Sequence, residues 1–493
     1  MSAKSAAKPV AKYAAKSAEP LDIDIAHFAI NYASKIGASY ADARLEATAV
    51  NGFVLKNGVP QIAGFDRVTG IGVRIVVNKT LGFACTNDLS KESVRRTVEK
   101  AAKLTRAAAK IGERVMFSDT RPEVAEYEVK QKVKLDSLEP KDKLRVLFDS
   151  EKAIKDTKVN VSGRFFSMSD FSTEKYFANT EGSRVLSKIP RTDFWYFVTV
   201  EEGGRTAQRY WQYGAAGGFE TITNCNFPEL LAAEVKATHN NLKKAVAAPK
   251  DKIDLVVAPQ ITGIMVHESV GHPYEADRVL GREAAQAGES FISRNMLGTR
   301  IGNGAVNIVD DPTIPGSFGY YLYDDEGVKA SERWLIRKGI ITELLHNRET
   351  AAIVGGKSNG SARATGYDRE PIVRMANTVF KPGDYKEEEL IESVKSGVYI
   401  RNFMEWNIDD KRLNAKYSGA EAYMIRNGRL RLGEPVWRPT IEISTPKLWS
   451  SVDAAAGNIE SHAGTCGKAE PMQAIPVWFG GPSLRIRNVK LSI

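Results

Sequence analysis

The segment 267–272 (HESVGH) constrains the fold of this chain more than any other, because its two histidines stand five positions apart. On a regular α-helix with about 3.6 residues per turn, residues at that spacing are rotated by about 140° and do not face one point. Gly271 relaxes the backbone beside His272, and Pro273 cannot continue a helical hydrogen-bond ladder. If His267 and His272 serve one site, the helix must widen into a π-type bulge or end there, and such bulges often mark functional sites.

Histidines paired in this way, with an acid after the first, indicate a metal site. A catalytic zinc ion takes three protein ligands and keeps one position open for water, so a third ligand must come from elsewhere. Four residues are candidates: Cys466, His462, Glu275 and Asp277. Cys466 lies in a glycine-flanked turn two residues before Lys468, whose charge favours a thiolate, and a thiolate ligand favours zinc.

Glu268 directly follows the first histidine, so its carboxylate can stand beside the ion without binding it. There it would act as general base and proton shuttle for a water molecule. The competing interpretation of His267 and His272 is a pair of hydrogen-bonded polar residues in an ordinary helix.

The composition is that of an ordinary globular protein, with 493 residues of which 43% are hydrophobic and 26% charged. No apolar stretch reaches the roughly 18 residues of a membrane helix, and the N-terminus has no apolar secretory core, so we expect no membrane contact and a cytoplasmic location. The three cysteines, at 85, 225 and 466, are far apart and form no C-x-x-C, which indicates reduced thiols.

The net charge of +9 is partly concentrated in residues 1–20, which hold four lysines and one glutamate. We interpret these residues as a disordered basic tail. The remaining excess is spread thinly over the chain, which argues against a dedicated nucleic-acid binder.

Hydrophobic periodicity predicts a mixed α/β N-terminal domain over 21–248 and a β-rich, layered or barrel-like C-terminal domain over 249–493, an α+β protein overall. Asn51-Gly52 and Asn57-Gly58 are predicted hairpin turns, and Gly355–Gly366 a mobile loop. The expected helices cover 21–36, 91–109, about 141–155 and about 229–244, and the expected strands cover 41–50, 52–56, 70–78, 162–168, 173–179, 194–200 and 206–213.

Four segments of the sequence resemble the TldD/PmbA metallopeptidases, once called modulators of DNA gyrase. They are HESVGHPYEAD (267–277), DDEG (324–327), RMANT (374–378) and GTCGK (464–468), in matching order and spacing. The resemblance is strong over 253–493 and follows the general layout over 21–250.

The resemblance implies a zinc peptidase of the active TldD-like type, with His267, His272 and Cys466 as metal ligands and Glu268 as the catalytic carboxylate. It also implies an enclosed site for unfolded or short peptides, and a dimer formed with itself or with a metal-lacking paralogue. The chain departs from the family at Pro273-Tyr274, where family members commonly have Gly-Leu. This departure affects the expected helix geometry and not the expected ligands.

Five further residues have two interpretations each. Glu275 and Asp277 either accept the ring N–H of a ligand histidine or form ion pairs at the end of the helix. Arg374 and Asn377 either hold a peptide backbone or terminus or take part in a structural ion pair. His462 either stabilises an oxyanion or orients substrate, or is a plain loop residue.

The sequence therefore predicts a zinc-dependent peptidase. The alternative is a non-catalytic dimer partner or scaffold of the same fold, against which the intact histidine, glutamate and cysteine set argues. A third hypothesis, nucleic-acid binding, rests on the basic balance and on the older name of the family that the sequence resembles. The aromatic and basic run 205–213 (RTAQRYWQY) is either an amphipathic strand or a cradle for an extended peptide or single-stranded nucleic acid.

Overall fold

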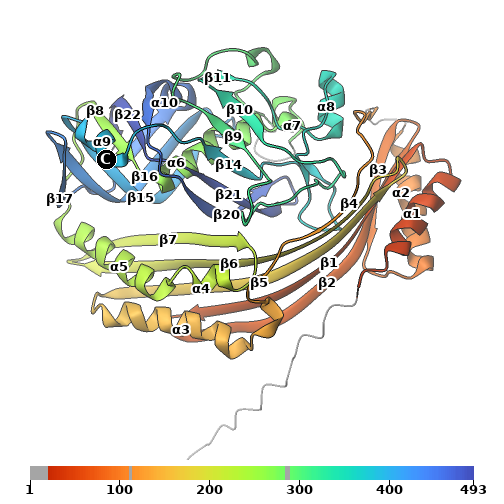
Figure 1. Ribbon diagram of the computed structural model, residues 1–493, viewed down its shortest axis with the longest axis horizontal. Coiled ribbons are helices and arrows are strands. Elements are labelled where there is room, and N and C mark those ends of the chain that lie inside the picture. The colour runs from red at the N-terminus through yellow and green to blue at the C-terminus, as the bar shows by residue number, and fades with distance from the viewer. Residues whose placement is uncertain (1–19, 110–113, 284–288, 493) are drawn as a thin grey trace, which may run out of the picture.

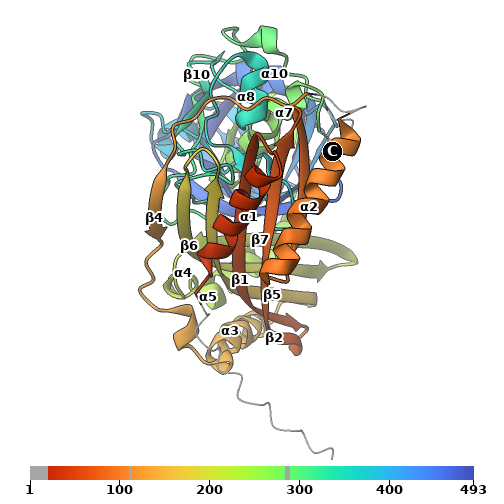
Figure 2. The ribbon, with the colours of Figure 1, turned by 90° about the vertical axis from the view of Figure 1, so that its right-hand side faces the viewer.

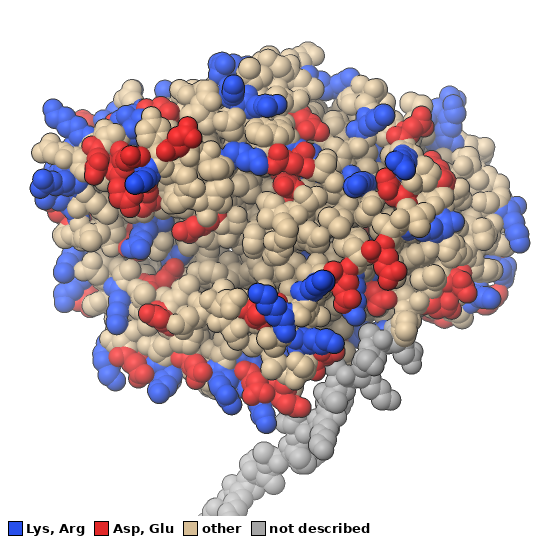
Figure 3. Space-filling view, viewed as in Figure 1, with Lys and Arg blue, Asp and Glu red and all other residues tan. Residues whose placement is uncertain are grey.

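The computed structural model describes residues 20–109, 114–283 and 289–492. The predicted basic tail lies outside the described residues except for Pro20. Among the described residues, no helix is both long enough and apolar enough to cross a bilayer. On the face shown in Figure 3, basic and acidic side chains are interspersed and do not form a patch of one sign.

The N-terminal half is built around one long sheet that curls into a half-barrel (Figure 1). Its strands lie in the order β3-β2-β1-β5-β6, and both β7 and the short parallel β4 pair with β6. The strands are β1 Tyr40–Lys56, β2 Val59–Val77, β3 Thr80–Thr86, β4 Val124–Glu128, β5 Val161–Asn179, β6 Arg184–Glu202 and β7 Arg205–Ala216.

Helices cover the outer face of this sheet in two groups. Helices α1 and α2 pack on the β1–β3 end, where they face the viewer in Figure 2. Helix α2 begins where expected, because the Ser90 side chain accepts the Ser93 N–H and caps its first turn. At the other end lie α3, α4 and α5 (Figure 1). The helices are α1 Ile23–Lys35, α2 Lys91–Ala108, α3 Pro140–Asp156, α4 Glu220–Thr223 and α5 Phe227–Lys244, with a short 3-10 turn at Leu135–Ser137.

The C-terminal half contains two larger sheets and a two-stranded one, and it lies in the concave side of the half-barrel (Figure 1). One sheet has the order β11-β10-β9-β14-β21-β20, the other β19-β22-β8-β15-β16-β18-β23 with β17 on β16, and β12 pairs with β13. The strands are β8 Ile253–Val257, β9 Ile308–Asp310, β10 Arg333–Arg337, β11 Ile340–Ile341, β12 Ala362–Arg363, β13 Ile372–Val373, β14 Asn377–Phe380, β15 Ser396–Ile408, β16 Asn414–Arg426, β17 Arg429–Pro435, β18 Thr440–Ser444, β19 Val452–Ala455, β20 Glu460–Lys468, β21 Gln473–Gly481, β22 Leu484–Val489 and β23 Leu491–Ser492.

Helix α6, Pro259–Val266, contacts strands of both C-terminal sheets and is buried along its whole length. The other helices of this half are α7 Ala276–Val279, α8 Arg348–Val354, α9 Glu387–Glu392 and α10 Thr445–Ser451, with a 3-10 turn at Arg294–Met296. The architecture confirms the predicted α+β class, with a mixed N-terminal half and a β-rich C-terminal half that carries the histidine helix. The division into domains at 248 stays a prediction.

The predicted turn at Asn51-Gly52 is wrong, whereas Asn57-Gly58 does turn, with φ of +49° and +82°. Strand β1 runs unbroken through Asn51, because β2 and β5 pair with it on both sides. The Asn51 side chain donates to Asp170 Oδ1 of β5 at 2.8 Å, and Asp170 also binds Lys143 of α3 at 2.8 Å. Pairing with distant strands thus overrides the local turn preference.

The predicted mobile loop, Gly355–Gly366, is wrong over residues 360–364, which are buried and include β12. The main-chain N–H of Ala362 donates to Asp324 Oδ2 at 3.0 Å, and that of Ala364 to Asp325 Oδ2 at 2.7 Å. Small side chains leave little to pack, but they let this backbone approach the acidic turn closely.

Candidate metal centre

A change of helix type brings the two histidines together. Helix α6 passes into a π-helical turn, His267–Gly271, and the N–H of His272 donates to the carbonyl of His267. The widened turn is what the five-residue spacing required, and the ring centroids of His267 and His272 lie 5.0 Å apart. Gly271 is needed for packing as well, since a Cβ there would lie 2.6 Å from Met375 Sδ.

Cys466 of β20 completes a cluster of three ligand atoms. The ligand atoms of His267, His272 and Cys466 all lie within 4.8 Å of one another, and Cys466 Sγ is 3.2 Å from His272 Nε2. Ligands of a tetrahedral zinc ion are separated by about 3.3–3.6 Å at ordinary bond lengths. All three side chains are buried. Two nitrogens and a sulfur converging in this way fit a zinc ion.

The protonation states of these groups also suit a metal. Burial lowers the pKa of His267 and of His272, which favours the neutral rings that bind metals. Burial alone would raise the pKa of the Cys466 thiol, but the His272 ring 3.2 Å from its sulfur and the Arg374 charge outweigh it, and the net shift is downward. His267 Nδ1 is buried without a hydrogen-bond partner in the described structure.

A buried carboxylate orients the second histidine. His272 Nδ1 lies 3.1 Å from Glu275 Oε2, so its Nε2 is directed toward Cys466. Glu275 is fully buried and also lies 3.2 Å from Arg278 and 3.2 Å from Lys468. Burial would raise the pKa of Glu275, but the Lys468 charge overrides it and holds the pKa well below its ordinary value.

Asp277 takes a different role from Glu275. It binds Lys468 at 2.7 Å and makes no contact with a histidine ring in the described structure. Of the two expected acceptors for a ligand histidine, the structure places Glu275 in that position, and Glu275 also forms the expected ion pair with Arg278.

Glu268 lies beside the cluster and is held by an arginine that was not among the predicted site residues. Arg412 Nη1 donates to Glu268 Oε2 at 2.6 Å, and both side chains are buried. Arg412 lies in the turn between β15 and β16, where its backbone is left-handed with φ of +63°. No local motif marks it, because it comes from a segment 144 positions away.

The cluster opens on a cavity of about 590 Å³ with aromatic walls. One wall comes from the half-barrel sheet and another from the C-terminal half. Its lining includes His267, Glu268, His272, Cys466, Tyr210, Trp211, Gln212, Phe403, Trp406 and Phe479. The run 205–213 is therefore a strand, β7, and three of its residues face this cavity.

Two further predicted site residues, Arg374 and Asn377, form hydrogen bonds with other groups of the protein. Arg374 is fully buried and donates to the main-chain carbonyls of Cys466, at 2.6 Å, and Gln473, at 2.7 Å. Its bonds fasten the strand that carries Cys466. Asn377 donates to Ser317 Oγ at 2.9 Å and to a main-chain carbonyl.

His462 lies on the same strand as Cys466, packed edge-on against Trp211 with ring centroids 5.2 Å apart. Burial lowers the pKa of His462 to about 3, so its ring is neutral at physiological pH.

Family models match most of the chain. The model of PmbA/TldA metallopeptidase domain 1 matches residues 41–105, that of the central domain residues 133–245, and that of the C-terminal domain residues 250–493. The chain belongs to the PmbA/TldD metallopeptidase family. The cluster and Glu268 lie in the part matched by the C-terminal model.

Relatives that match over nearly their whole length are named as metalloproteases, in agreement with the family models. A metalloprotease of Methanocaldococcus jannaschii is 32% identical over 90% of this chain and 95% of its own length. A zinc metalloprotease TldD homolog of Saccharolobus solfataricus is 25% identical over 94% of this chain and 98% of its own. The names support a metallopeptidase with a metal cofactor.

Solved structures share the fold. TldE from Thermococcus kodakarensis superposes with a TM-score of 0.73 at 16% identity, covering 95% of this chain and all of its own. This chain therefore has the same overall fold as that protein, a half-barrel sheet around a β-rich half.

Proposed function

We propose that this protein is a zinc-dependent peptidase in which His267, His272 and Cys466 hold the ion and Glu268 is the general base. The observation that carries the proposal is the convergence of two imidazoles and a thiol within 4.8 Å, beside a buried carboxylate. The family and the names of the relatives support the same reaction class.

Zinc in a site with three protein ligands acts as a Lewis acid on a carbonyl and activates water for attack. The chain's own residues take up and transfer the proton. Arg412 fixes one oxygen of Glu268, Oε2, which leaves Oε1 to take a proton from the attacking water and pass it to the leaving amine. Glu275 holds the ring of His272 in one orientation, and Arg374 holds the Cys466 strand.

The cavity supports unfolded or short peptides as substrates. His267, Glu268, His272 and Cys466 are at most 7% exposed, so the surface of a folded protein does not reach them. A cavity of about 590 Å³ between aromatic walls accepts a few residues of extended chain at a time.

The test measures zinc per chain and cleavage of an unstructured peptide in the same preparations. We expect one zinc per chain in the wild type, loss of zinc in Cys466→Ala, and loss of cleavage with zinc retained in Glu268→Gln. Cys225→Ala is the matched control, because Cys225 is a partly buried thiol outside the cluster. Zinc bound equally without Cys466 would refute the ligand set.

The same experiment separates the peptidase from the scaffold alternative. Retained zinc without Glu268-dependent cleavage would favour a non-catalytic partner. Dimerisation, with itself or with a metal-lacking paralogue, is part of the proposal and is measured by light scattering of the purified chain alone and mixed with such a paralogue.

A further inference from the structure

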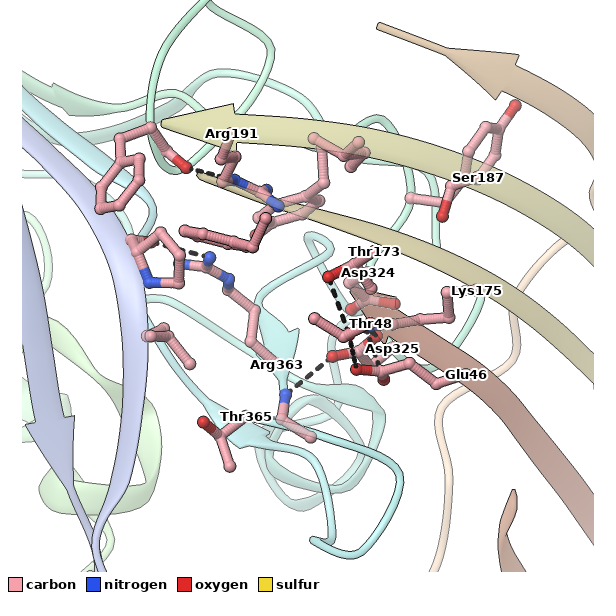
Figure 4. Close-up of a pocket in the computed structure, with 18 of the residues that line it drawn as sticks. Glu46, Thr48, Thr173, Lys175, Ser187, Arg191, Asp324, Asp325, Arg363 and Thr365 are labelled. Carbon is pink, nitrogen blue, oxygen red and sulfur yellow. Dashed lines mark hydrogen bonds and ion pairs between the residues drawn. The ribbon is translucent and has the colours of Figure 1, made fainter. Parts of the chain in front are cut away.

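A second cavity, of about 330 Å³, lies between the half-barrel sheet and the C-terminal half (Figure 4). It is separate from the metal cavity, although Thr465, the neighbour of Cys466, lines both. Gln212 lines the metal cavity and donates from its Nε2 to Thr465 Oγ1 at 2.9 Å and to Asp193 Oδ1 at 2.8 Å, two residues that line the second cavity. The proposed peptidase reaction makes no use of this space.

Two buried arginines reach into one end of this cavity from β6 and β12, and both are 7% exposed (Figure 4). Arg191 donates to the main-chain carbonyls of Phe318, at 2.8 Å, and Tyr320, at 2.9 Å. Arg363 donates to those of Met375, at 2.9 Å, and Pro476, at 2.8 Å. A guanidinium has five N–H donors, so these bonds use only part of each group.

Neither guanidinium forms an ion pair with a carboxylate of the described residues, although the cavity contains carboxylates. Those acids have partners of their own. Asp325 binds Lys175 at 2.6 Å, and Asp324 accepts three main-chain N–H groups. With Glu46 they gather at the other end of the cavity (Figure 4).

Within the described part of the chain, the two arginines are therefore buried cations without a carboxylate in ion-pair contact, and Asp325 attracts both only from a longer distance. Burial and the repulsion of Arg363 lower the pKa of Arg191 to about 9, and burial lowers the pKa of Arg363 as well. Arg191 nevertheless stays charged at neutral pH. Taking a guanidinium out of water without an anion is costly, and an anionic group bound between the two would offset that cost.

We propose that the Arg191–Arg363 end of this cavity binds the carboxylate of a small ligand. The guanidinium fork matches a planar carboxylate, and the volume is at the small end of ligand pockets. The acids at the far end disfavour a multiply charged anion and suit a cationic or polar group there. The carboxylate belongs either to a free small acid or to a short peptide with a free C-terminus.

The test is isothermal titration of zinc-loaded Glu268→Gln protein, which binds without turnover if the proposed function holds. The probes are dialanine, dialaninamide and butyrate, a monocarboxylate. We expect dialanine or butyrate to bind and dialaninamide to bind at least about tenfold more weakly, because only the acids offer a carboxylate to the guanidinium groups. Binding of butyrate alone would identify a free acid as ligand, and binding of dialanine alone the end of a peptide.

Variants then locate the binding. In the Glu268→Gln background, Arg191→Gln or Arg363→Gln should weaken the binding of the acid at least about tenfold. Lys188→Gln is the matched control, since it removes the same charge from an exposed position of β6. If a glutamine variant fails to fold, Arg363→Lys keeps the charge and the comparison of acid with amide needs no variant at all.

Equal binding of dialanine and dialaninamide, no binding of either acid, or arginine variants that bind like Lys188→Gln would overturn the inference. These outcomes say nothing about hydrolysis, and loss of hydrolysis with intact acid binding would leave the inference standing. A failure of the carboxylate-binding inference can therefore be distinguished from a failure of the proposed peptidase function.

Discussion

Replacing Glu275 by glutamine should weaken zinc binding through a residue that does not touch the ion. Glu275 Oε2 lies 3.1 Å from His272 Nδ1 and fixes the ring that faces Cys466. Loss of such a carboxylate partner typically costs 10–100-fold in metal affinity, or about 1.4–2.7 kcal/mol. We expect a shift of that size in the zinc dissociation constant, measured by competition with a chromophoric chelator.

The charge balance around Glu275 predicts a second effect. Three cations, Lys468, Arg278 and Arg374, face three buried or half-buried acids, Glu275, Asp277 and Glu283. Removing one acid leaves an uncompensated buried positive charge, which costs roughly 3–5 kcal/mol of stability. The melting temperature of the metal-free protein should therefore fall together with the zinc affinity.

Glu283→Gln separates the two effects. Glu283 lies 3.4 Å from Lys468 and 3.8 Å from Arg278, so its loss disturbs the same charge balance, but Glu283 makes no contact with His272 in the described structure. We expect a comparable loss of melting temperature with zinc affinity close to the wild type. If both variants weaken zinc equally, or neither does, the assignment of Glu275 as the residue that orients His272 is wrong.

Three further predictions follow from other contacts. Arg412→Met should keep one zinc per chain but lower kcat at least about tenfold, because Glu268 loses the partner that positions it; unchanged turnover would refute this role. Burial raises the pKa of Asp193 from 3.8 to about 7, so the wild type should lose up to about 4 kcal/mol of stability as pH rises through that window, and the melting temperature of Asp193→Asn relative to wild type should rise between pH 5 and pH 8. Arg74→Met should cost roughly 3–5 kcal/mol, because it leaves the buried carboxylates Asp42 and Glu326 without this counter-ion, whereas Arg95→Met, at an exposed ion pair, should leave the melting temperature close to that of the wild type.

The sequence predicts the parts of the metal centre that depend on local geometry. The five-residue spacing of His267 and His272 required a widened helix, and the structure has a π-helical turn at that place. Glu275 could be predicted as a partner of the His272 ring because it follows His272 by three residues. Arg412 reaches the cavity from a turn 144 positions away from Glu268, and no periodicity or spacing in one sequence reports such long-range packing.

The fold shows the same division between local and distant information. Helices such as α2 were predictable because their caps and apolar spacing are local. The long strands were not, because Asn51-Gly52 has the composition of a turn yet is held extended by strands on both sides. In a curled sheet of long strands, pairing between distant segments decides where a strand ends, and turn propensity has only a minor influence.

The acidic turn 324–327 is one of the segments in which the sequence resembles the family. It is a short local motif, but its contacts are with distant parts of the chain. It lies outside the metal cluster, and each of its acids fastens a different part of the protein. Asp324 caps its own turn and holds β12, Asp325 binds Lys175 of β5, and Glu326 binds Arg74 of β2 at 2.9 Å. The turn thus ties the C-terminal half to the concave side of the half-barrel sheet, from which β7 contributes the aromatic wall of the metal cavity. The turn therefore contributes to the metal cavity without supplying a catalytic atom, because it sets the position of one half of the cavity against the other.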